Sequence, residues 1–256
     1  RPVPQSTVAG EKTAPTQPFP TKPPPFEIQG IQEDDLIDFT PELRAAAKRI
    51  LEGYHHGPLY PPPVVDKPTV YMPGWGGGAN WMGCTVDPET SMLYIPSMRS
   101  PIALQLAKPD AARSNFDYIG RLSYGVPGPK GLPLFKPPYG SITAIDLNTG
   151  DMRWKIPLGD GPRDHPLLKE MNLPPLGNSG RAFVLTTRSL LLVAHASRPP
   201  RLYAFDKSSG KEIARKDLAA TPRGALMTYM SGQKQYISIP VGGQFGSGLL
   251  TLALPD

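Results

Sequence analysis

Cysteine is nearly missing from this chain of 256 residues, which contains Cys84 alone. An intrachain disulfide and a zinc site built from several cysteines are therefore excluded. The few histidines show no metal-ligand spacing such as HExxH, and we interpret them as surface or packing residues; they are His55, His56, His165 and His195. No apolar run reaches about 18 residues, so we expect no membrane-spanning helix.

Motifs of export and of nucleic-acid binding are missing as well. The chain opens with RPVPQ, without an initiator methionine or an apolar signal core, so we expect that a leader has been removed or that this is part of a longer product. The formal net charge is +5, but no recognition helix, zinc finger or RNP pattern accompanies it. We therefore expect no nucleic-acid partner. Three interpretations of the basic residues stay open: they bind an acidic protein, they support peripheral association with an anionic membrane surface, or they have no partner.

Proline, in contrast, is abundant, and many of the 34 prolines fall within residues 1–68. Proline fixes φ and lacks an N–H, so this arm should be extended and should lie along another surface. Aromatic residues spaced through it favour a docked arm over a free linker; they are Phe19, Phe26, Phe39 and Tyr60. One helix is expected at about 41–53, where Thr40 suits the N-cap, Pro41 suits the first turn and Gly53 ends the helix.

From residue 69 onward the pattern changes to short alternating strands, and it repeats. The segments SITAIDLNTGDMRWKIPL (141–158) and RLYAFDKSSGKEIARKDL (201–218) superpose without a gap. Each predicts a β-hairpin in which an aspartate closes the turn and a glycine takes positive φ. We therefore interpret Asp146 and Asp206 as turn residues and not as a catalytic pair. Further alternating strands are expected at 92–98, 189–196 and 235–243, the last followed by GLLTLALP at 248–255.

Repeated four-stranded units of this kind are typical of β-propeller blades. The chain holds two nearly complete units and a third that is cut short, whereas a closed propeller needs about four to eight blades. The expected fold is therefore all-β, with an incomplete β-propeller at 69–256 preceded by the Pro-rich arm and its short helix. The arm, self-association or a second polypeptide must cover the blade faces and strand edges that stay open. We also expect Trp154 to be buried between blades.

Several stretches together resemble the PQQ-dependent quinoprotein dehydrogenases of the membrane-associated glucose or sugar dehydrogenase type. They are PTQPFP, GWGGGANW, GLPLFKPPYG, the A-x-D-x-x-T-G-x-x-x-W-K hairpin, LGDGPRDHP and MTYMSGQKQYISIPVGG. The resemblance runs along nearly the whole chain and matches the C-terminal half of such an enzyme. It implies the C-terminal blades of an eight-bladed propeller with PQQ and usually Ca²⁺ near its axis, in the periplasm or cell envelope.

The same resemblance limits what this chain should contribute to chemistry. The catalytic aspartate and the metal ligands of the family lie in the earlier half, so it implies no catalytic and no metal-binding residue here. Whether PQQ binds to this chain therefore stays open.

The resemblance assigns the glycine-rich stretch PGWGGGANWMG to the cofactor. In the family a GG-x-N-W segment begins an inner strand, and its asparagine can hydrogen-bond the edge of the quinone; the matching residues are Gly77, Gly78, Asn80 and Trp81. Glycines let the backbone approach a flat ligand, and asparagine offers a donor and an acceptor in one plane. The alternative is that Trp75 and Trp81 are packing residues and that the glycines form a bulge.

The chain departs from the family pattern in the second hairpin and its surroundings. The family tryptophan that locks one blade against the next is present at Trp154 but is Ala214 in the second copy. An aspartate that many members place near the axis is replaced by the segment SRPP at 197–200. Residues 114–140 are expected to form a long loop over the top of the propeller, and such loops are where partners and substrates usually bind.

Two functions from different classes stay open. The first is the C-terminal portion of a PQQ-dependent sugar or alcohol dehydrogenase, which passes electrons to a quinone or cytochrome and needs the N-terminal blades of another chain for its active site. The second is a non-catalytic structural or docking subunit of a larger envelope complex, built on a degenerate propeller. In both, a second polypeptide or a larger complex is the expected partner.

Overall fold

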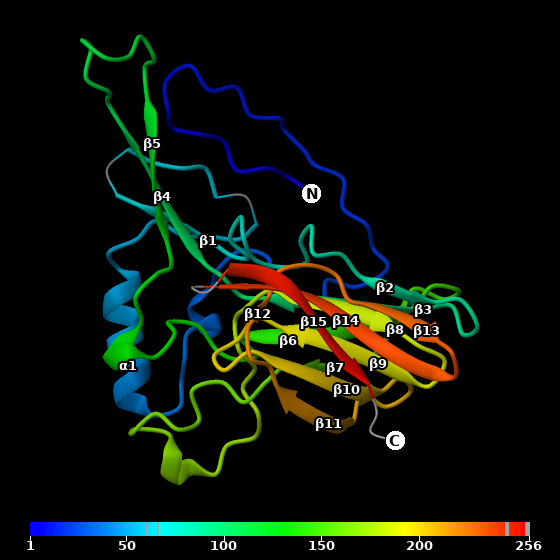
Figure 1. Ribbon diagram of the computed structural model, residues 1–256. Coiled ribbons are helices and arrows are strands. Elements are labelled where there is room, and N and C mark those ends of the chain that lie inside the picture. Colours follow the sequence, from blue (N-terminus) through cyan, green and yellow to red (C-terminus); the bar gives the residue numbers. More distant parts are fainter. Residues whose placement is uncertain (60, 66, 244–245, 254–256) are drawn as a thin grey trace.

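Figure 1 shows the chain as a computed structural model, which describes residues 1–256 except 60, 66, 244–245 and 254–256. Four antiparallel sheets follow the helix α1 (Pro41–Leu51), and short 3-10 turns lie at Glu33–Asp35, Pro129–Gly131 and Lys169–Met171. Tyr60 and the end of the strand predicted at 248–255 lie outside the described residues. The all-β prediction with one short helix is confirmed.

Helix α1 forms where its capping signals predict it. The Thr40 hydroxyl accepts a hydrogen bond from the backbone N–H of Leu43 at 3.2 Å, which satisfies one of the free donors at the helix start. Leu43, Ala47 and Leu51 share one buried face of the helix. The helix ends at Leu51, slightly before the predicted end at residue 53.

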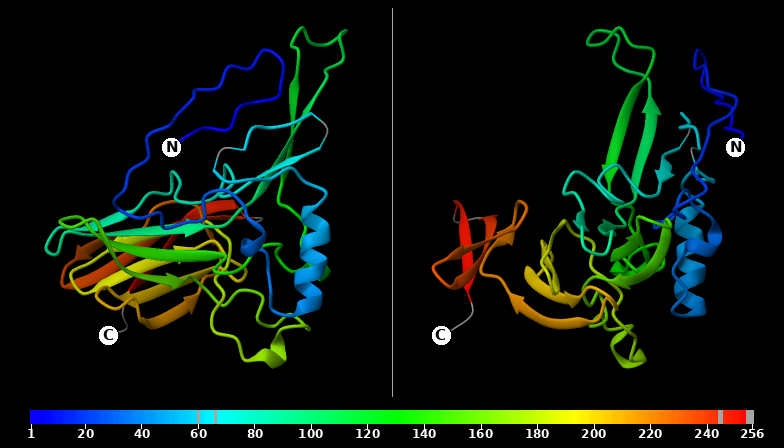
Figure 2. Two further views of the ribbon diagram at one scale, coloured as in Figure 1. Left: turned by 180° about the vertical axis from the view of Figure 1, so that it is seen from behind. Right: turned by 90° about the vertical axis from the view of Figure 1, so that its right-hand side faces the viewer.

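Three of the sheets are arranged like consecutive blades (Figure 2). In the first blade the spatial order is β2 (Thr85–Asp87), β3 (Met92–Met98), β6 (Gly140–Asp146) and β7 (Asp151–Pro157). In the second it is β8 (Ala182–Thr186), β9 (Leu190–His195), β10 (Arg201–Asp206) and β11 (Glu212–Asp217). In the third, β14 (Lys234–Gly243) pairs with β12 (Thr221–Pro222), β13 (Met227–Ser231) and β15 (Gly246–Ala253). The segments predicted as strands are thus confirmed, with small shifts at their ends.

The two repeated hairpins have the predicted turns. The Asp146 carboxylate accepts a hydrogen bond from the N–H of Asn148 at 2.9 Å, and Gly150 has a φ of +71°. In the second copy the Asp206 carboxylate accepts one from the N–H of Ser209 at 2.8 Å, and Gly210 has a φ of +70°. Both aspartates are therefore turn residues.

Side chains of the first blade contact the second blade at Lys207, in the turn of its hairpin. The Lys207 carbonyl accepts hydrogen bonds from Trp154 Nε1 at 3.1 Å and from the Tyr94 hydroxyl at 3.2 Å. Lys207 Nζ also pairs with the buried carboxylate of Asp87 at 2.6 Å. Trp154 therefore lies between blades as predicted, but it is half-buried and not buried, because its strand β7 is the outer strand of the blade.

Between the second and third sheets the packing relies on aliphatic side chains. Phe183, Leu192 and Leu202 of the second blade form one core with Leu226 and Ile239. Ala214, which stands where the first copy has its tryptophan, is exposed. The second blade thus lacks the aromatic lock that the first one has.

The prediction of one long loop at 114–140 is wrong. Within it, β5 (Ile119–Tyr124) pairs with β4 (Ile102–Ala107), and β1 (Thr69–Tyr71) completes this fourth sheet. The β4–β5 hairpin projects from the molecule in Figure 1. Because both faces of β5 are largely exposed, the strand carries little apolar periodicity that would predict it.

The proline-rich arm is docked from about residue 26 onward, where Phe39 packs against a buried cluster, whereas residues 1–25 are largely exposed. In the right-hand view of Figure 2 the arm and α1 stand beyond the first blade, on the side away from the second. Lys22 of the arm pairs with Asp151 of β7 at 2.8 Å. Ile31, Leu36 and α1 share a core with β1 and with Phe135. The division of the chain at residue 68 stays a prediction.

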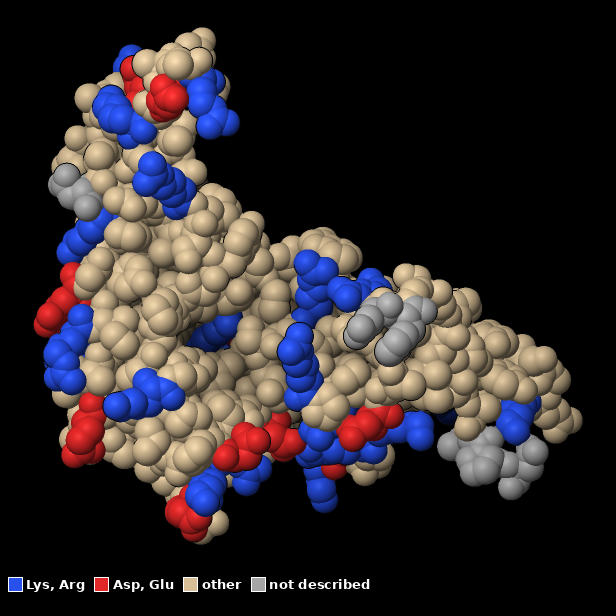
Figure 3. Space-filling model, turned by 60° about the vertical axis from the view of Figure 1, so that its left-hand side comes forward, with Lys and Arg blue, Asp and Glu red and all other residues tan. Residues whose placement is uncertain are grey.

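The surface carries charges of both signs. On the face shown in Figure 3, Lys and Arg side chains are interspersed with Asp and Glu, and the middle of that face is largely uncharged. In the part of the chain that the structure describes, no helix has the length and apolar composition needed to cross a bilayer.

Candidate cofactor surface

The glycine-rich stretch lies where the first strands of two blades meet. It leads into β2, the first strand of its blade, and the N–H of Thr186 in β8 donates to the Thr85 hydroxyl in β2 at 3.2 Å. The blades spread apart from this edge, which we call the inner edge (Figure 2). The predicted cofactor residues therefore sit at the start of an inner strand.

Glycine is needed here because the loop runs directly against the end of β3. Gly78 exchanges two backbone hydrogen bonds with Met98, at 2.7 and 3.3 Å, and has a φ of +66°. A Cβ on Gly77 would lie 3.0 Å from the Met98 carbonyl, and one on Gly74 would lie 2.0 Å from the Ser100 carbonyl. The glycines thus permit a close backbone approach, which leaves the N–H of Gly78 already bonded.

Asn80 shapes the loop through its own side chain. Its amide oxygen accepts the Trp81 N–H at 2.7 Å, and its amide nitrogen donates to the Trp75 carbonyl at 3.3 Å. Trp75 and Trp81 are 62% and 67% exposed, so neither is a buried packing residue in this chain. Asn80 therefore holds two exposed indoles on one tight turn.

Arg181 is a further residue of this surface that the sequence did not reveal. Its guanidinium lies 5.3 Å from the centre of the Trp81 ring, in cation–π geometry, and Phe183 meets the same ring edge-on at 6.4 Å. Arg181 is exposed and comes immediately before β8, across the inner edge from Trp81. The only signal in the sequence was a basic residue beside Gly180 at a strand start.

Glu27 of the arm is the second residue that sequence reasoning missed. Its side chain is 5% exposed and accepts hydrogen bonds from the hydroxyls of Ser97 at 2.6 Å and Ser141 at 3.1 Å. It also pairs with Arg99 at 3.2 Å and with Lys155 at 3.3 Å. Burial opposes ionisation, but these partners together hold the pKa of Glu27 below its ordinary value. This carboxylate fastens the arm beside the glycine loop.

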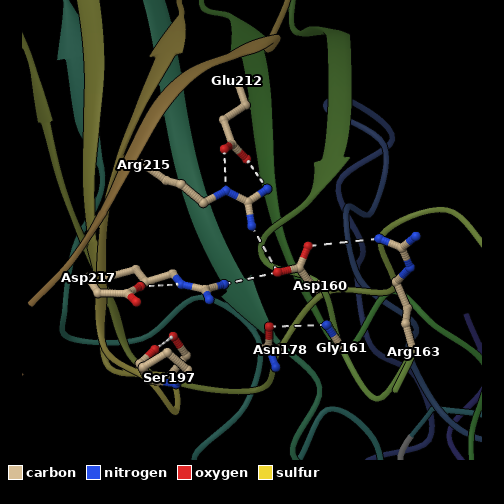
Figure 4. A network of polar contacts seen from close by, with 10 residues as sticks. Asp160, Gly161, Arg163, Asn178, Ser197, Glu212, Arg215 and Asp217 are labelled. Carbon is tan, nitrogen blue, oxygen red and sulfur yellow. Dashed lines mark hydrogen bonds and ion pairs between the residues drawn. The ribbon is translucent and has the colours of Figure 1, made fainter. Parts of the chain in front are cut away.

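Another polar network, drawn in Figure 4, connects the segment after β7 to the second blade. Asp160 accepts Arg201 at 2.9 Å and Arg215 at 2.8 Å, and Arg163 approaches it at 3.9 Å. The hydrogen bond from Arg201 to Asp217, at 2.7 Å, raises the pKa of Arg201. Because every one of these charges has a partner in the network, we assign it to blade packing.

The comparisons with known proteins decide the family. The family model for the glucose, ethanol and alcohol dehydrogenase β-propeller domain, named PQQ, matches residues 1–237. The chain belongs to this family.

Relatives within the PQQ dehydrogenase family match this chain along its whole length. A probable quinate dehydrogenase (quinone) of Xanthomonas campestris pv. juglandis is 28% identical over 281 residues, which cover 100% of this chain and 35% of that protein. The quinoprotein glucose dehydrogenase of Escherichia coli strain K12 is 28% identical over 293 residues, with the same two shares. The chain thus spans about a third of the length of these curated relatives.

Solved structures agree with the blade arrangement. A europium-containing methanol dehydrogenase aligns with a TM-score of 0.51 at 17% identity, over 74% of this chain and 30% of that one. This likeness supports the propeller fold alone. In the described part of the chain three sheets are arranged as blades, and these three do not close into a ring.

The residues of this chain fit PQQ in part. PQQ is a flat tricarboxylate, and the inner edge offers an exposed indole, a cation and an amide in Trp81, Arg181 and Asn80. Among the described residues, no three or more His, Cys, Asp or Glu side chains are grouped so that they could hold a metal ion. We therefore derive no step through a metal on this chain.

Proposed function

We propose that this chain is a portion of a PQQ-dependent dehydrogenase that oxidises the CH–OH group of a sugar, an alcohol or a cyclic hydroxy acid. The family match over residues 1–237 carries this proposal, and the quinate and glucose dehydrogenases among its relatives suggest the substrate classes. The acceptor is a quinone, as in the names of the quinate-oxidising relatives. The location that we propose, from the resemblance to the family, is the periplasm or cell envelope.

In this proposal the chain contributes one wall of the cofactor site. When bound, PQQ supplies the oxidising chemistry by taking up two electrons from the alcohol. Trp81 offers a flat apolar face, and Arg181 beside it offers a positive charge to a carboxylate. Asn80 keeps the indole in place through its bond to the Trp81 N–H, so it acts as a positioning residue and has one amide hydrogen left for a ligand.

The remaining wall and the catalytic groups belong to blades outside this chain. Large apolar side chains are exposed on the third sheet, among them Met230 at 60% and Leu249 at 66%. Such surfaces are normally covered, and a second polypeptide with the N-terminal blades is the partner that we propose. An interface of that kind buries more than about 2,000 Å².

A non-catalytic docking subunit is the second candidate. The projecting β4–β5 hairpin favours it, because Phe116 and Tyr124 are 71% and 78% exposed there. Exposed aromatic residues on a projecting element are typical of protein-binding surfaces. In this role the inner edge would have no ligand.

The two tryptophans provide a matched test. PQQ is titrated into the complete assembly and binding is followed by the absorbance of the quinone. Trp81→Ala should weaken PQQ binding at least tenfold, while Trp75→Ala, which removes an equally exposed indole, should leave it unchanged. Asn80→Ala should cost about 1–3 kcal/mol of binding free energy. PQQ binding that is unchanged in Trp81→Ala, as in Trp75→Ala, would favour the docking role.

A further inference from the structure

A cavity of about 700 Å³ lies between the proline-rich arm and the glycine loop. The arm contributes Phe19, Pro20 and Phe26, and the loop side contributes Pro73, Gly77 and Gly78. Most of its lining therefore consists of rings and bare backbone, and the one basic side chain in it is Arg1, whose guanidinium lies 5.0 Å from the centre of the Phe19 ring. A lining of this kind accepts a flat, apolar ligand.

Few polar side chains line the cavity, and they differ in whether they are free to hydrogen-bond a ligand. Glu27 is occupied by its partners on the first blade, as described above. Thr21 and Gln29 are exposed and make no hydrogen bond within the described part of the chain. Their hydroxyl and amide groups can donate to carbonyl oxygens of a ligand.

The position of the cavity relates it to the candidate cofactor surface. Gly77, Gly78 and Ala79 line it, whereas the next residues, Asn80 and Trp81, do not. The cavity therefore shares the two glycines with the candidate cofactor surface and adjoins Asn80 and Trp81 without including them. Two such adjoining sites are what an oxidoreductase needs when one bound molecule must reduce another.

We propose that this cavity binds the ring of the quinone that accepts the electrons. The inference rests on the proposed function for the identity of the acceptor. The quinone takes up two electrons and two protons to become a quinol, and both pairs come from the CH–OH group as it becomes a carbonyl. Phe19, Phe26 and the prolines contact the ring, and Gln29 and Thr21 donate to its carbonyls.

The anchoring of the arm keeps the cavity in shape. Glu27 follows directly after Phe26, and its four side-chain partners on the first blade fix this wall against the sheet. The Phe26 carbonyl also accepts a hydrogen bond from Lys155 Nζ. An extended arm without such an anchor would lose its position through chain entropy.

The test measures binding of ubiquinone-1 to the full chain, without PQQ, by equilibrium dialysis. Ala79→Trp puts an indole at the cavity wall and should weaken binding at least tenfold. Ala112→Trp is the matched control, because Ala112 is also exposed but lies at the far end of the β4–β5 hairpin. Gln29→Ala, at an exposed position, should weaken binding a few-fold with the fold intact.

Equal binding by the Ala79→Trp and Ala112→Trp variants, or no binding by the unmodified chain, would overturn the inference. Circular dichroism of each variant verifies that it is folded. The outcome is separable from the proposed function, because PQQ binding that depends on Trp81 would still support that function if ubiquinone-1 did not bind. Conversely, ubiquinone-1 binding without PQQ binding would leave a quinone site on a non-catalytic chain.

Discussion

Glu27 is the residue on which the position of the arm depends most. Glu27→Gln keeps the size of the side chain but removes its charge, and leaves Arg99 and Lys155 without their counter-charge in a largely buried place. The free energy of unfolding should fall by roughly 3 kcal/mol, as is usual when one partner of a buried ion pair is removed. Urea unfolding followed by circular dichroism measures this loss.

The control for this prediction is Glu33→Gln. Glu33 pairs with Lys48 at 2.7 Å, but both side chains are about half exposed or more, at 62% and 46%. Such surface pairs contribute little to stability. A loss for Glu27→Gln no larger than that for Glu33→Gln would contradict the anchoring role.

His195 should make the chain sensitive to mild acid. It is fully buried, and burial lowers its pKa from 6.5 to about 4. Between these two values the unfolded chain binds the proton and the folded one does not, so stability is present above pH 6.5 and is lost as pH falls toward 4. The free energy of unfolding should drop by about 2 kcal/mol between pH 7 and pH 5.

Substitution identifies the source of this acid sensitivity. His195→Gln should flatten the decline between pH 6.5 and 4.5, and His165→Gln should retain it. Glu27 acts in a lower window, because its depressed pKa makes its contribution present above its ordinary value of 4.5 and lost below that. A decline that persists in His195→Gln would assign the sensitivity to other groups.

At the scale of elements, the two repeated hairpins differ in what their turn glycines touch. Both Gly150 and Gly210 have positive φ, so alanine at either position costs about 1 kcal/mol or more. A Cβ on Gly210 would also lie 3.0 Å from the Trp154 ring, whereas one on Gly150 would meet the flexible Lys22 side chain at 3.1 Å. Gly210→Ala should therefore destabilise the chain more than Gly150→Ala does.

Thermal unfolding of the two variants measures the difference. We expect Gly210→Ala to have the lower Tm, because the indole must move away from the contact that joins the blades. Removing the indole in the double variant Trp154→Ala, Gly210→Ala should remove the extra cost of the alanine. Equal Tm values for the two single variants would show that Trp154 can shift freely.

For the whole molecule, the open side of the third sheet predicts association. β15 pairs with β14 and with no other described strand, and Leu249 on it is 66% exposed. The isolated chain should associate at micromolar concentration, and Leu249→Lys should reduce this because edge charges oppose strand pairing. Sedimentation velocity measures the effect, with Leu167→Lys, at an exposed apolar residue in the segment after β7, as control. A monodisperse monomer of the unmodified chain would contradict this prediction.

Local features of the fold followed from the sequence. Thr40, Pro41 and the apolar face define α1, and the two Asp-x-x-(Ser/Thr)-Gly turns define their hairpins, because each depends on residues close together in the chain. Strand β5 was missed because it is exposed and pairs with β4. Full burial of Trp154 was predicted wrongly, since its exposure depends on the outer position of β7.

The sequence by itself determined the blade repeat and the family, because both lie in continuous motifs, and the resemblance to the family suggested the four candidate cofactor residues. Only the tertiary structure decided that Glu27 reaches Arg99 and Lys155, that Arg181 covers Trp81, and that the arm encloses a cavity beside the glycine loop. These contacts join segments far apart in the chain. Their partners are selected by how the blades and the arm pack, and no local pattern in the sequence encodes that packing.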